Sequence, residues 1–317
     1  YMHITLCLSK CGYCAFNSRP LEPEKLEQTS LLLVREMELA AGWYPHSQPL
    51  LSLYFGGGTP SLLAPEQISR LIEHSQELFG HTSSIEITLE ANPGTVNLAS
   101  LCSYRQAGVT RLSLGAQSFN DRMLQTLGRR HTADETRNSF QLAQQAGFNS
   151  VGLDLICGLP QQTEADWQSD LEGALALQPD HFSVYSLTIE EGTPFASRYP
   201  DGSAELPDDD QSATRLETAD QILTAAGYEH YEIANFARPG CRSEHNCGYW
   251  QRDGYLGIGP GAHSFLRQGW GIRRGNQGDY EIWADALQHN SPAAVEQHQL
   301  SRAEALSETI FLGLRMA

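Results

Sequence analysis

Three cysteines near the start of the chain are spaced closely enough to share one metal centre. Cys7, Cys11 and Cys14 form a C-x3-C-x2-C run that directly follows the extended apolar stretch 1–6. Thiolate sulfur is the ligand that iron–sulfur clusters prefer. A cubane cluster held by three cysteines keeps one iron without a protein ligand, just as reactive metal sites keep an open position. The run therefore predicts a [4Fe-4S] cluster with one free coordination position.

Other roles fit these cysteines less well. A zinc site would need a fourth Cys or His at matching spacing, and no C-x2-C or H-x3-H follows downstream. A disulfide framework is disfavoured because the chain has seven cysteines, an odd number, and shows no secretory leader. Reduced thiols and an oxygen-sensitive cluster together predict a cytoplasmic protein.

Composition excludes several classes of partner. The chain has 317 residues and a formal charge of −17, from 21 Lys and Arg against 38 Asp and Glu. So acidic a chain is a poor candidate for binding nucleic acid or an anionic membrane surface. No apolar run approaches the ~20 residues that a membrane-spanning helix needs. We therefore expect neither nucleic acid as a partner nor an integral membrane protein.

The first two thirds of the chain alternate between strand-like and helix-like patterns. The apolar stretches are 1–6, 51–55, 85–89, 111–114, 151–156 and 181–187, and the helical patterns are 23–41, 65–79, 98–107, 134–146, 164–177 and 208–226. Such alternation predicts βαβ units and a parallel sheet. Six units are too few for a closed eight-stranded barrel. The fold class predicted for residues 1–227 is therefore α/β, an open partial (β/α)6 barrel.

The pattern changes after about Tyr228. Short strands and glycine-rich loops such as 257–261 follow, which predicts a small accessory α+β region over residues 228–317. Residues 301–316 have apolar side chains at helical spacing and no Gly or Pro terminator. We expect the chain to stop in or just after this helix, before a further C-terminal module.

Polar residues follow several of the predicted strands, where sites in β/α barrels lie. The second strand ends in the glycine run 56–60, which matches neither a P-loop nor a dinucleotide fingerprint and alone indicates only a tight turn. Glu90, Gln117, Arg129 and Asp154 lie at or after later strands. Arg129 could form a structural ion pair with Glu90 or Asp154. Together, these side chains could instead surround a zwitterionic ligand that bears a ribose.

Taken together, these segments resemble the HemN/HemW branch of radical S-adenosylmethionine (SAM) proteins. The similarity covers the start of the chain, the cysteine run, 56–60, 90–93, 112–119 and 154–160. It implies a radical SAM barrel whose [4Fe-4S] cluster is held by the three cysteines and whose open iron is chelated by SAM. It also implies that the SAM pocket is formed by Tyr1, Tyr13, Gly57, Gly58, Thr59, Glu90, Gln117, Arg129 and Asp154.

Two features distinguish the members of this branch. Coproporphyrinogen dehydrogenases of the HemN type carry a fourth cysteine where this chain has Phe16. The segment 245–250 matches an H-N-x-x-Y-W motif that is associated with haem in the HemW type, which implies haem binding by His245, Tyr249 and Trp250. Imidazole is a good haem-iron ligand, and aromatic rings can stack on a porphyrin.

The resemblance therefore implies a haem chaperone with a [4Fe-4S] cluster, SAM and haem as cofactors. Its expected partners are haem, acceptor haemoproteins such as those of respiration, and an electron donor for the cluster. Two alternatives stay open. One is an oxygen-independent coproporphyrinogen III dehydrogenase, and the other is a radical SAM enzyme with an unrelated substrate.

Overall fold

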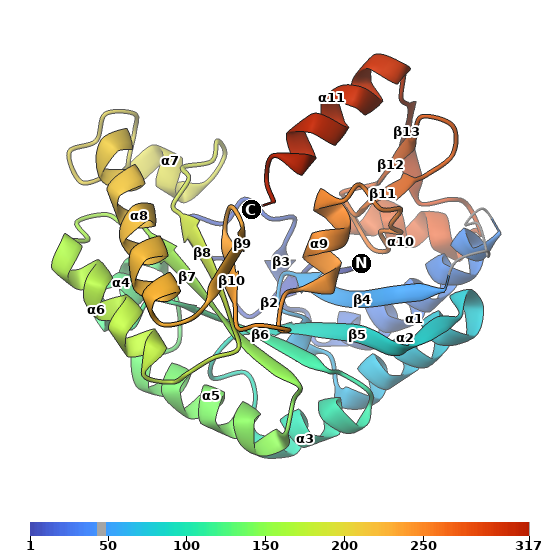
Figure 1. The fold of residues 1–317 in the computed structure, drawn as a ribbon. Coiled ribbons are helices and arrows are strands. Elements are labelled where there is room, and N and C mark those ends of the chain that lie inside the picture. Colours follow the sequence, from blue (N-terminus) through green and yellow to red (C-terminus); the bar gives the residue numbers. More distant parts are fainter. Residues whose placement is uncertain (43–48, 317) are drawn as a thin grey trace.

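A parallel sheet forms the centre of the molecule. The computed structural model describes residues 1–42 and 49–316. Six strands lie side by side in chain order, each parallel to the next (Figure 1). They are β1 (Met2–Ile4), β4 (Leu50–Gly57), β5 (His81–Ala91), β6 (Arg111–Gln117), β7 (Ser150–Cys157) and β8 (His181–Ser186). The predicted partial (β/α)6 barrel is confirmed.

Helices cover the outer face of this curved sheet. They are α1 (Glu24–Ala41), α2 (Pro65–Phe79), α3 (Leu98–Gln106), α5 (Ala133–Ala146), α6 (Glu164–Leu175) and α8 (Asp209–Ala225). The shorter helices α4 (Asp121–Leu127) and α7 (Pro194–Arg198) instead pack against the loop at Gly12 and form a second core cluster, and a 3-10 turn η1 (Pro60–Leu62) follows β4. Local chemistry sets their limits. Thr132 and Thr163 form capping boxes at the starts of α5 and α6, and Gly147 ends α5 in the left-handed conformation.

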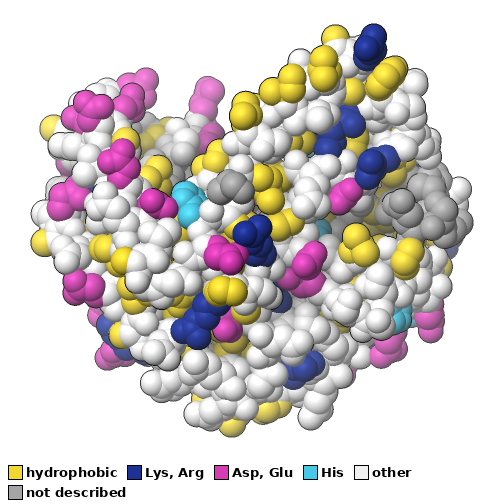
Figure 2. All heavy atoms as spheres, in the orientation of Figure 1, with side chains coloured by type: hydrophobic (Ala, Val, Ile, Leu, Met, Phe, Trp, Pro, Cys, Tyr) yellow, Lys and Arg dark blue, Asp and Glu magenta, His cyan; other side chains and the backbone are white. Residues whose placement is uncertain are grey.

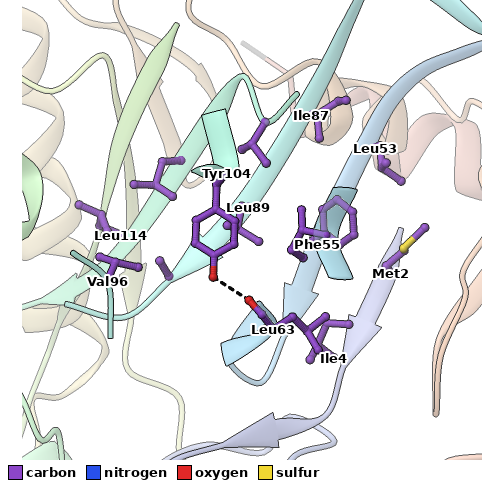
Figure 3. Close-up of a cluster of buried hydrophobic side chains, with 14 of the residues drawn as sticks. Met2, Ile4, Leu53, Phe55, Leu63, Ile87, Leu89, Val96, Tyr104 and Leu114 are labelled. Atoms are coloured by element: carbon purple, nitrogen blue, oxygen red, sulfur yellow. Dashed lines mark hydrogen bonds between the residues drawn. The ribbon is translucent and has the colours of Figure 1, made fainter. Parts of the chain in front are cut away.

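The main core lies between the sheet and the helices. Side chains such as Phe55, Leu89 and Leu114 are completely buried there (Figure 3). Burying one such side chain contributes about 1.5–3 kcal/mol relative to leaving it in water. Tyr104 also points into this core, and its hydroxyl donates to the carbonyl oxygen of Leu63 at 2.7 Å, which satisfies a polar group that burial would otherwise penalise.

Two further strands extend the sheet beyond β8. The strand β10 (Asn235–Ala237) pairs antiparallel with β8, and β9 (Glu229–Glu232) pairs with β10. The first residues of the predicted accessory region thus belong to the same sheet as the barrel. The boundary after residue 227 stays a prediction. The remaining elements are β2 (Leu6–Cys7), β3 (Arg19–Pro20), α9 (Glu244–Trp250), β11 (His263–Leu266), β12 (Ile272–Asn276), α10 (Tyr280–Gln288), β13 (Ala294–Gln299) and α11 (Arg302–Gly313).

A buried carboxyl group joins the accessory elements to the barrel. Glu36 on α1 accepts hydrogen bonds from the backbone N–H of Gly259 at 2.7 Å and from Nε1 of Trp283 at 2.9 Å, and Asn276 donates a third. Burial raises the pKa of Glu36 to about 7. Three donors converge on one side chain, so the position of residues 259–283 on the barrel is closely specified.

Acidic and hydrophobic side chains are distributed differently over the surface. Figure 2 shows acidic side chains spread over the visible face and hydrophobic ones gathered along α11. Leu306, Ile310 and Phe311 on α11 and Leu314 directly after it are all more than half exposed. Within residues 1–42 and 49–316, no helix is long and apolar enough to cross a membrane.

Candidate functional site at the carboxyl ends of the strands

The three cysteines lie at the mouth of the barrel. Cys7 ends β2, and the loop that follows carries Cys11 and Cys14. All three line one cavity of about 380 Å³ at the carboxyl ends of the parallel strands, a size in the range of small-ligand sites. The same cavity is lined by the predicted residues Tyr13, Gly57, Gly58, Thr59, Glu90, Gln117, Arg129 and Asp154.

The three thiols line one cavity but are not grouped closely enough to ligate a single metal ion. Among the described residues, no three His, Cys, Asp or Glu side chains are grouped as ligands of a single metal ion. Each cysteine of a cubane binds a different iron, so its ligands surround a cluster. Burial raises the pKa of Cys7 and Cys11, and the nearby Arg129 opposes this on both thiols. A soft metal centre would deprotonate these thiols on binding, so the donor set fits an iron–sulfur cluster.

The glycine-rich loop packs directly against the cysteine segment. The N–H of Gly58 donates to the carbonyl oxygen of Ile4, and that of Thr59 donates to Leu6. A Cβ on Gly58 would stand 2.7 Å from the carbonyl oxygens of Ile4 and Leu6 and 3.0 Å from Sγ of Cys7. Glycine at this position is therefore required by the close approach of two backbones, beside the first cysteine.

Arg129 carries a positive charge without an acidic partner. Its Nη1 donates to Oδ1 of Asn92 at 2.7 Å, and its Nη2 donates to the hydroxyl of Tyr13 at 2.8 Å. Its Nε is buried and has no partner. No carboxylate in the described part of the chain lies within 4.0 Å of it, so the structural ion pair with Glu90 or Asp154 is not formed. The guanidinium is free to pair with a bound anion.

Two carboxylates line the same cavity, also without a cationic partner among the described residues. Glu90 accepts from the hydroxyl of Tyr54 at 2.8 Å and from the N–H of Gly57 at 3.2 Å. Asp154 accepts from the Ser113 hydroxyl at 3.0 Å. Burial, chiefly, raises the pKa of Glu90 to about 7 and that of Asp154 above its usual range. Pairing with an ammonium, or accepting hydrogen bonds from hydroxyl groups, would lower the pKa of either carboxyl group.

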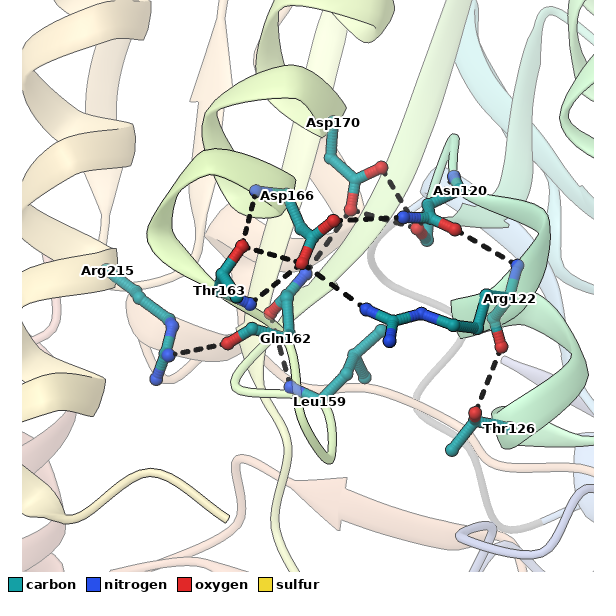
Figure 4. Close-up of polar contacts among 10 residues, drawn as sticks. Asn120, Arg122, Thr126, Leu159, Gln162, Thr163, Asp166, Asp170 and Arg215 are labelled. Carbon is teal, nitrogen blue, oxygen red and sulfur yellow. Dashed lines mark hydrogen bonds and ion pairs between the residues drawn. The ribbon is translucent and has the colours of Figure 1, made fainter. Parts of the chain in front are cut away.

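Gln117 enters the cavity because the end of β6 is irregular. The register with β7 shifts between Leu114 and Gln117, and Gln117 adopts a positive φ of 67°. The loop behind it is held by Asp170 of α6, whose carboxylate accepts from the Ser118 hydroxyl and the N–H of Phe119. Nε2 of Gln162 also donates to Asp170, and Nδ2 of Asn120 donates to the neighbouring Asp166 (Figure 4). The neighbouring helix thus fixes the position of Gln117.

Sequence reasoning missed several residues that line or support the cavity. Asn92 connects Arg129 to the glycine loop, because its Nδ2 donates to Oγ1 of Thr59 at 2.9 Å. Tyr54 and Ser113 hold the two carboxylates. The sequence could have indicated Tyr54, because residues 52, 54 and 56 of the second strand point to the same face of the sheet. Asn92 lies directly past a strand end, where such a role is common.

Tyr1 lies beside the cavity, next to Tyr54, but is not part of its lining. Its hydroxyl instead bonds Nδ1 of His3 at 2.9 Å. Its ring lies 6.0 Å from that of Tyr54 and 6.3 Å from that of His245. Contact between Tyr1 and SAM stays a prediction.

The predicted haem residues lie on α9 but do not form one exposed surface. His245 is buried, with Nδ1 bonded to the hydroxyl of Ser52 and Nε2 to that of Tyr249, both at 2.9 Å. Burial lowers the pKa of His245 well below 6.5, so the ring is neutral. Trp250 lies under the guanidinium of Arg315, whose Cζ is 4.1 Å from the ring centroid. Neither nitrogen of His245 is free for iron in this conformation.

The comparisons with known proteins agree with the fold and the cysteine loop. The family model described as the radical SAM superfamily matches residues 1–173. Among solved structures, coproporphyrinogen III oxidase (HemN) from Escherichia coli superimposes with a TM-score of 0.86 at 27% identity, over 99% of this chain and 74% of that one. The barrel and the three-cysteine loop thus define a radical SAM protein.

Two curated relatives narrow the assignment. Heme chaperone HemW of Haemophilus influenzae is 43% identical over 270 residues, which span 84% of this chain and 70% of that protein. HemW of Bacillus subtilis is 34% identical over 99% of this chain and 82% of that protein. The chain therefore belongs to the HemW family of the radical SAM superfamily, and the resemblance inferred from its motifs is confirmed.

The raised pKa of Glu90 predicts a pH dependence of stability. The folded protein holds a proton on Glu90 between its ordinary pKa of 4.5 and about 7, while the unfolded chain releases it. The protonated Glu90 therefore makes its full contribution to the free energy of unfolding below pH 4.5. This contribution, roughly 3 kcal/mol, is lost as the pH rises through 7. Urea unfolding of ligand-free protein from pH 4.5 to 7.5 should show a shallower decline in Glu90→Gln than in wild type.

The matched control is Glu73→Gln, which changes an exposed carboxyl on α2. It should keep the wild-type pH profile. Glu36, also with a pKa of about 7, adds a decline of the same sign to every variant. An identical decline in Glu90→Gln and wild type would show that Glu90 is not protonated in the folded state.

Proposed function

We propose that the chain is a cytoplasmic haem chaperone that binds a [4Fe-4S] cluster and SAM at the barrel mouth, binds haem through the region of α9, and passes haem to acceptor haemoproteins. Its expected partners also include an electron donor for the cluster. One observation carries the proposal. Three cysteines, an unpaired guanidinium and two unpaired carboxylates line the same cavity, in a chain that belongs to the HemW family.

The cluster would be held by Cys7, Cys11 and Cys14. When bound, it supplies an open iron on which the amino and carboxylate groups of SAM can be chelated. The residues around the thiols suit this role. Thr59 donates its hydroxyl toward Sγ of Cys7 at 3.5 Å, and Arg129 places positive charge near Cys11 and Cys14. Both interactions favour sulfur that carries negative charge.

The polar lining suits the separate charges of SAM. An Arg guanidinium binds a carboxylate through two parallel hydrogen bonds, and Arg129 has a buried Nε with no partner. Glu90 and Asp154 can accept from an ammonium or from ribose hydroxyls. Burying a charge without a partner is costly, so a cation and two carboxylates that do not pair with each other favour a ligand with both kinds of group.

Haem would bind at α9, but this requires a change at His245. For its imidazole to ligate iron, the hydrogen bond from Ser52 or that from Tyr249 has to open. Trp250 is better placed for stacking, since the flat guanidinium of Arg315 already lies over its ring. If His245 keeps its bonds, Cys247 on the same helix and the exposed His263 are the next candidate ligands.

A dehydrogenase of the HemN type is the second candidate function. The structural similarity to E. coli HemN over 99% of this chain favours it. Against it, the position of the fourth cysteine of that type is taken by Phe16, whose side chain is 65% exposed and cannot hold a metal. We therefore rank the chaperone first.

Arg129→Ala tests the SAM site. The variant should weaken SAM binding by ~1.5–3 kcal/mol, because it removes a charge-assisted bond to the carboxylate. Anaerobic calorimetry on the reconstituted protein measures this affinity. Arg130→Ala, which removes the exposed neighbouring charge, is the matched control and should bind SAM almost as wild type does. Equal affinity of Arg129→Ala and wild type would assign Arg129 a purely structural role.

Parallel assays distinguish the chaperone from the dehydrogenase. With the cluster, SAM and a reductant present, the protein should bind haem stoichiometrically in a Soret titration and leave coproporphyrinogen III unconsumed. His245→Ala should lower haem affinity or shift the Soret band, whereas His74→Ala, on the outer helix α2, should not. Haem binding that is unaffected by changes at His245, Tyr249 and Trp250 would move the site elsewhere. Formation of protoporphyrinogen would overturn the chaperone proposal.

A further inference from the structure

The Tyr54 side chain links the ligand cavity to His245 on helix α9, and Ser243 and Asn246 at the start of that helix also line the cavity. The hydroxyl of Tyr54 donates to Oε1 of Glu90 at 2.8 Å on the cavity side. The face of the same ring stacks on His245, with centroids 4.8 Å apart and planes at 25°. Burial raises the pKa of Tyr54 well above 10, so the phenol keeps its proton and remains a donor. A change in the position or charge of Glu90 therefore alters its hydrogen bond with Tyr54, and the Tyr54 ring contacts α9.

The contact between Tyr54 and Glu90 leaves no room for a side chain at residue 56. A Cβ on Gly56 would lie 2.9 Å from Cε1 of Tyr54, 3.0 Å from Cε2 of Tyr1 and 3.1 Å from Oε1 of Glu90. The first glycine of the 56–58 run thus leaves room for two aromatic rings and a carboxylate to meet. Real Cβ atoms rarely tolerate such distances, so the absence of a side chain at Gly56 is required by this junction.

The same two strands also hold α9 directly. Ser52, two residues before Tyr54 on β4, bonds Nδ1 of His245. Glu86, four residues before Glu90 on β5, accepts from the N–H groups of Glu244 and His245 at 3.2 and 3.1 Å. Residues two or four apart on a strand share one face. The inner face of β4 and β5 therefore leads continuously from the N-terminus of α9 to the carboxylate in the cavity.

We propose that Tyr54 is a positioning residue that couples Glu90 to helix α9, so that a cationic ligand bound at Glu90 tightens the packing of α9 on the barrel. An ionised carboxylate accepts a stronger hydrogen bond than a neutral carboxyl group. A cationic ligand beside Glu90 keeps the carboxylate ionised, which fixes the Tyr54 ring and with it the stacked His245. The ligand class rests on the proposed function, in which SAM brings a permanent sulfonium charge and an amino group whose N–H can donate to Glu90.

The consequence concerns the haem motif. Release of His245 requires α9 to loosen, and the ligand at Glu90 opposes that loosening through Tyr54. Such coupling is reciprocal in binding free energy, so a ligand that pulls His245 away should in turn weaken the ligand at Glu90. A chaperone could use this relation to keep its motif helix closed while SAM is bound.

Hydrogen exchange of the backbone amides in α9 tests the proposal. In anaerobically reconstituted wild-type protein, saturating SAM should slow exchange of residues 244–250 by about threefold to tenfold. In Tyr54→Phe, SAM should still slow exchange of the glycine loop but leave α9 unchanged. Tyr280→Phe, which removes the buried bond to Thr29 far from this junction, should respond as wild type does. A wild-type α9 unaffected by bound SAM, or an α9 response retained in Tyr54→Phe, overturns the proposal.

Two measurements distinguish failure of this proposal from failure of the proposed SAM site: one with SAM present and one without ligand. If SAM does not slow exchange at residues 56–58 in wild type, the proposed SAM site fails. The coupling is then decided by a double-mutant cycle of Glu90→Gln and His245→Gln, with α9 exchange as the readout. The effects should be non-additive by at least about threefold in the wild-type background and additive in Tyr54→Phe. Additive effects in both backgrounds would overturn the coupling.

Discussion

Unpaired charge at the barrel mouth is the constraint on which the rest of the site depends. Arg129 is held by the neutral groups of Asn92 and Tyr13, while Glu90 is held by Tyr54 and a backbone N–H. A cation and a carboxylate in one small cavity would normally pair. Here, each is kept in place by neutral donors or acceptors instead. The cavity therefore keeps the guanidinium and the carboxyl group available for a ligand with complementary groups.

The rest of the fold serves to maintain this separation. Parallel strands bring residues from distant parts of the sequence to one edge, and the outer network around Asp170 fixes the loop that presents Gln117. The accessory elements attach to the barrel at two places. Glu36 on α1 accepts hydrogen bonds from them, and α9 packs on the inner face of β4 and β5.

Much of this arrangement could be predicted from the sequence, and the exceptions have physical reasons. The six strands were predicted because long alternations of apolar strands and amphipathic helices are strong signals, whereas β9 and β10 are short and were assigned to the accessory region. The strand-end rule placed Glu90, Gln117, Arg129 and Asp154 at one site. It could not decide whether Arg129 pairs with an acid, because that depends on Asn92, which binds the guanidinium in place of a carboxylate. On α9, helical spacing brings His245 and Tyr249 to one face and turns Trp250 away from it, an outcome that motif matching alone does not show.

The central claim is that Cys7, Cys11 and Cys14 hold a [4Fe-4S] cluster that SAM completes. The most direct measurement is anaerobic iron and sulfide analysis, with electron paramagnetic resonance before and after SAM, on a Cys7/Cys11/Cys14→Ser variant. Its matched control is Cys102/Cys241/Cys247→Ser, which changes three other partly exposed cysteines. The account predicts a full cluster with a SAM-dependent spectrum in wild type and control, and none in the first variant. A full cluster in the first variant, or a wild-type spectrum that SAM does not alter, would contradict it.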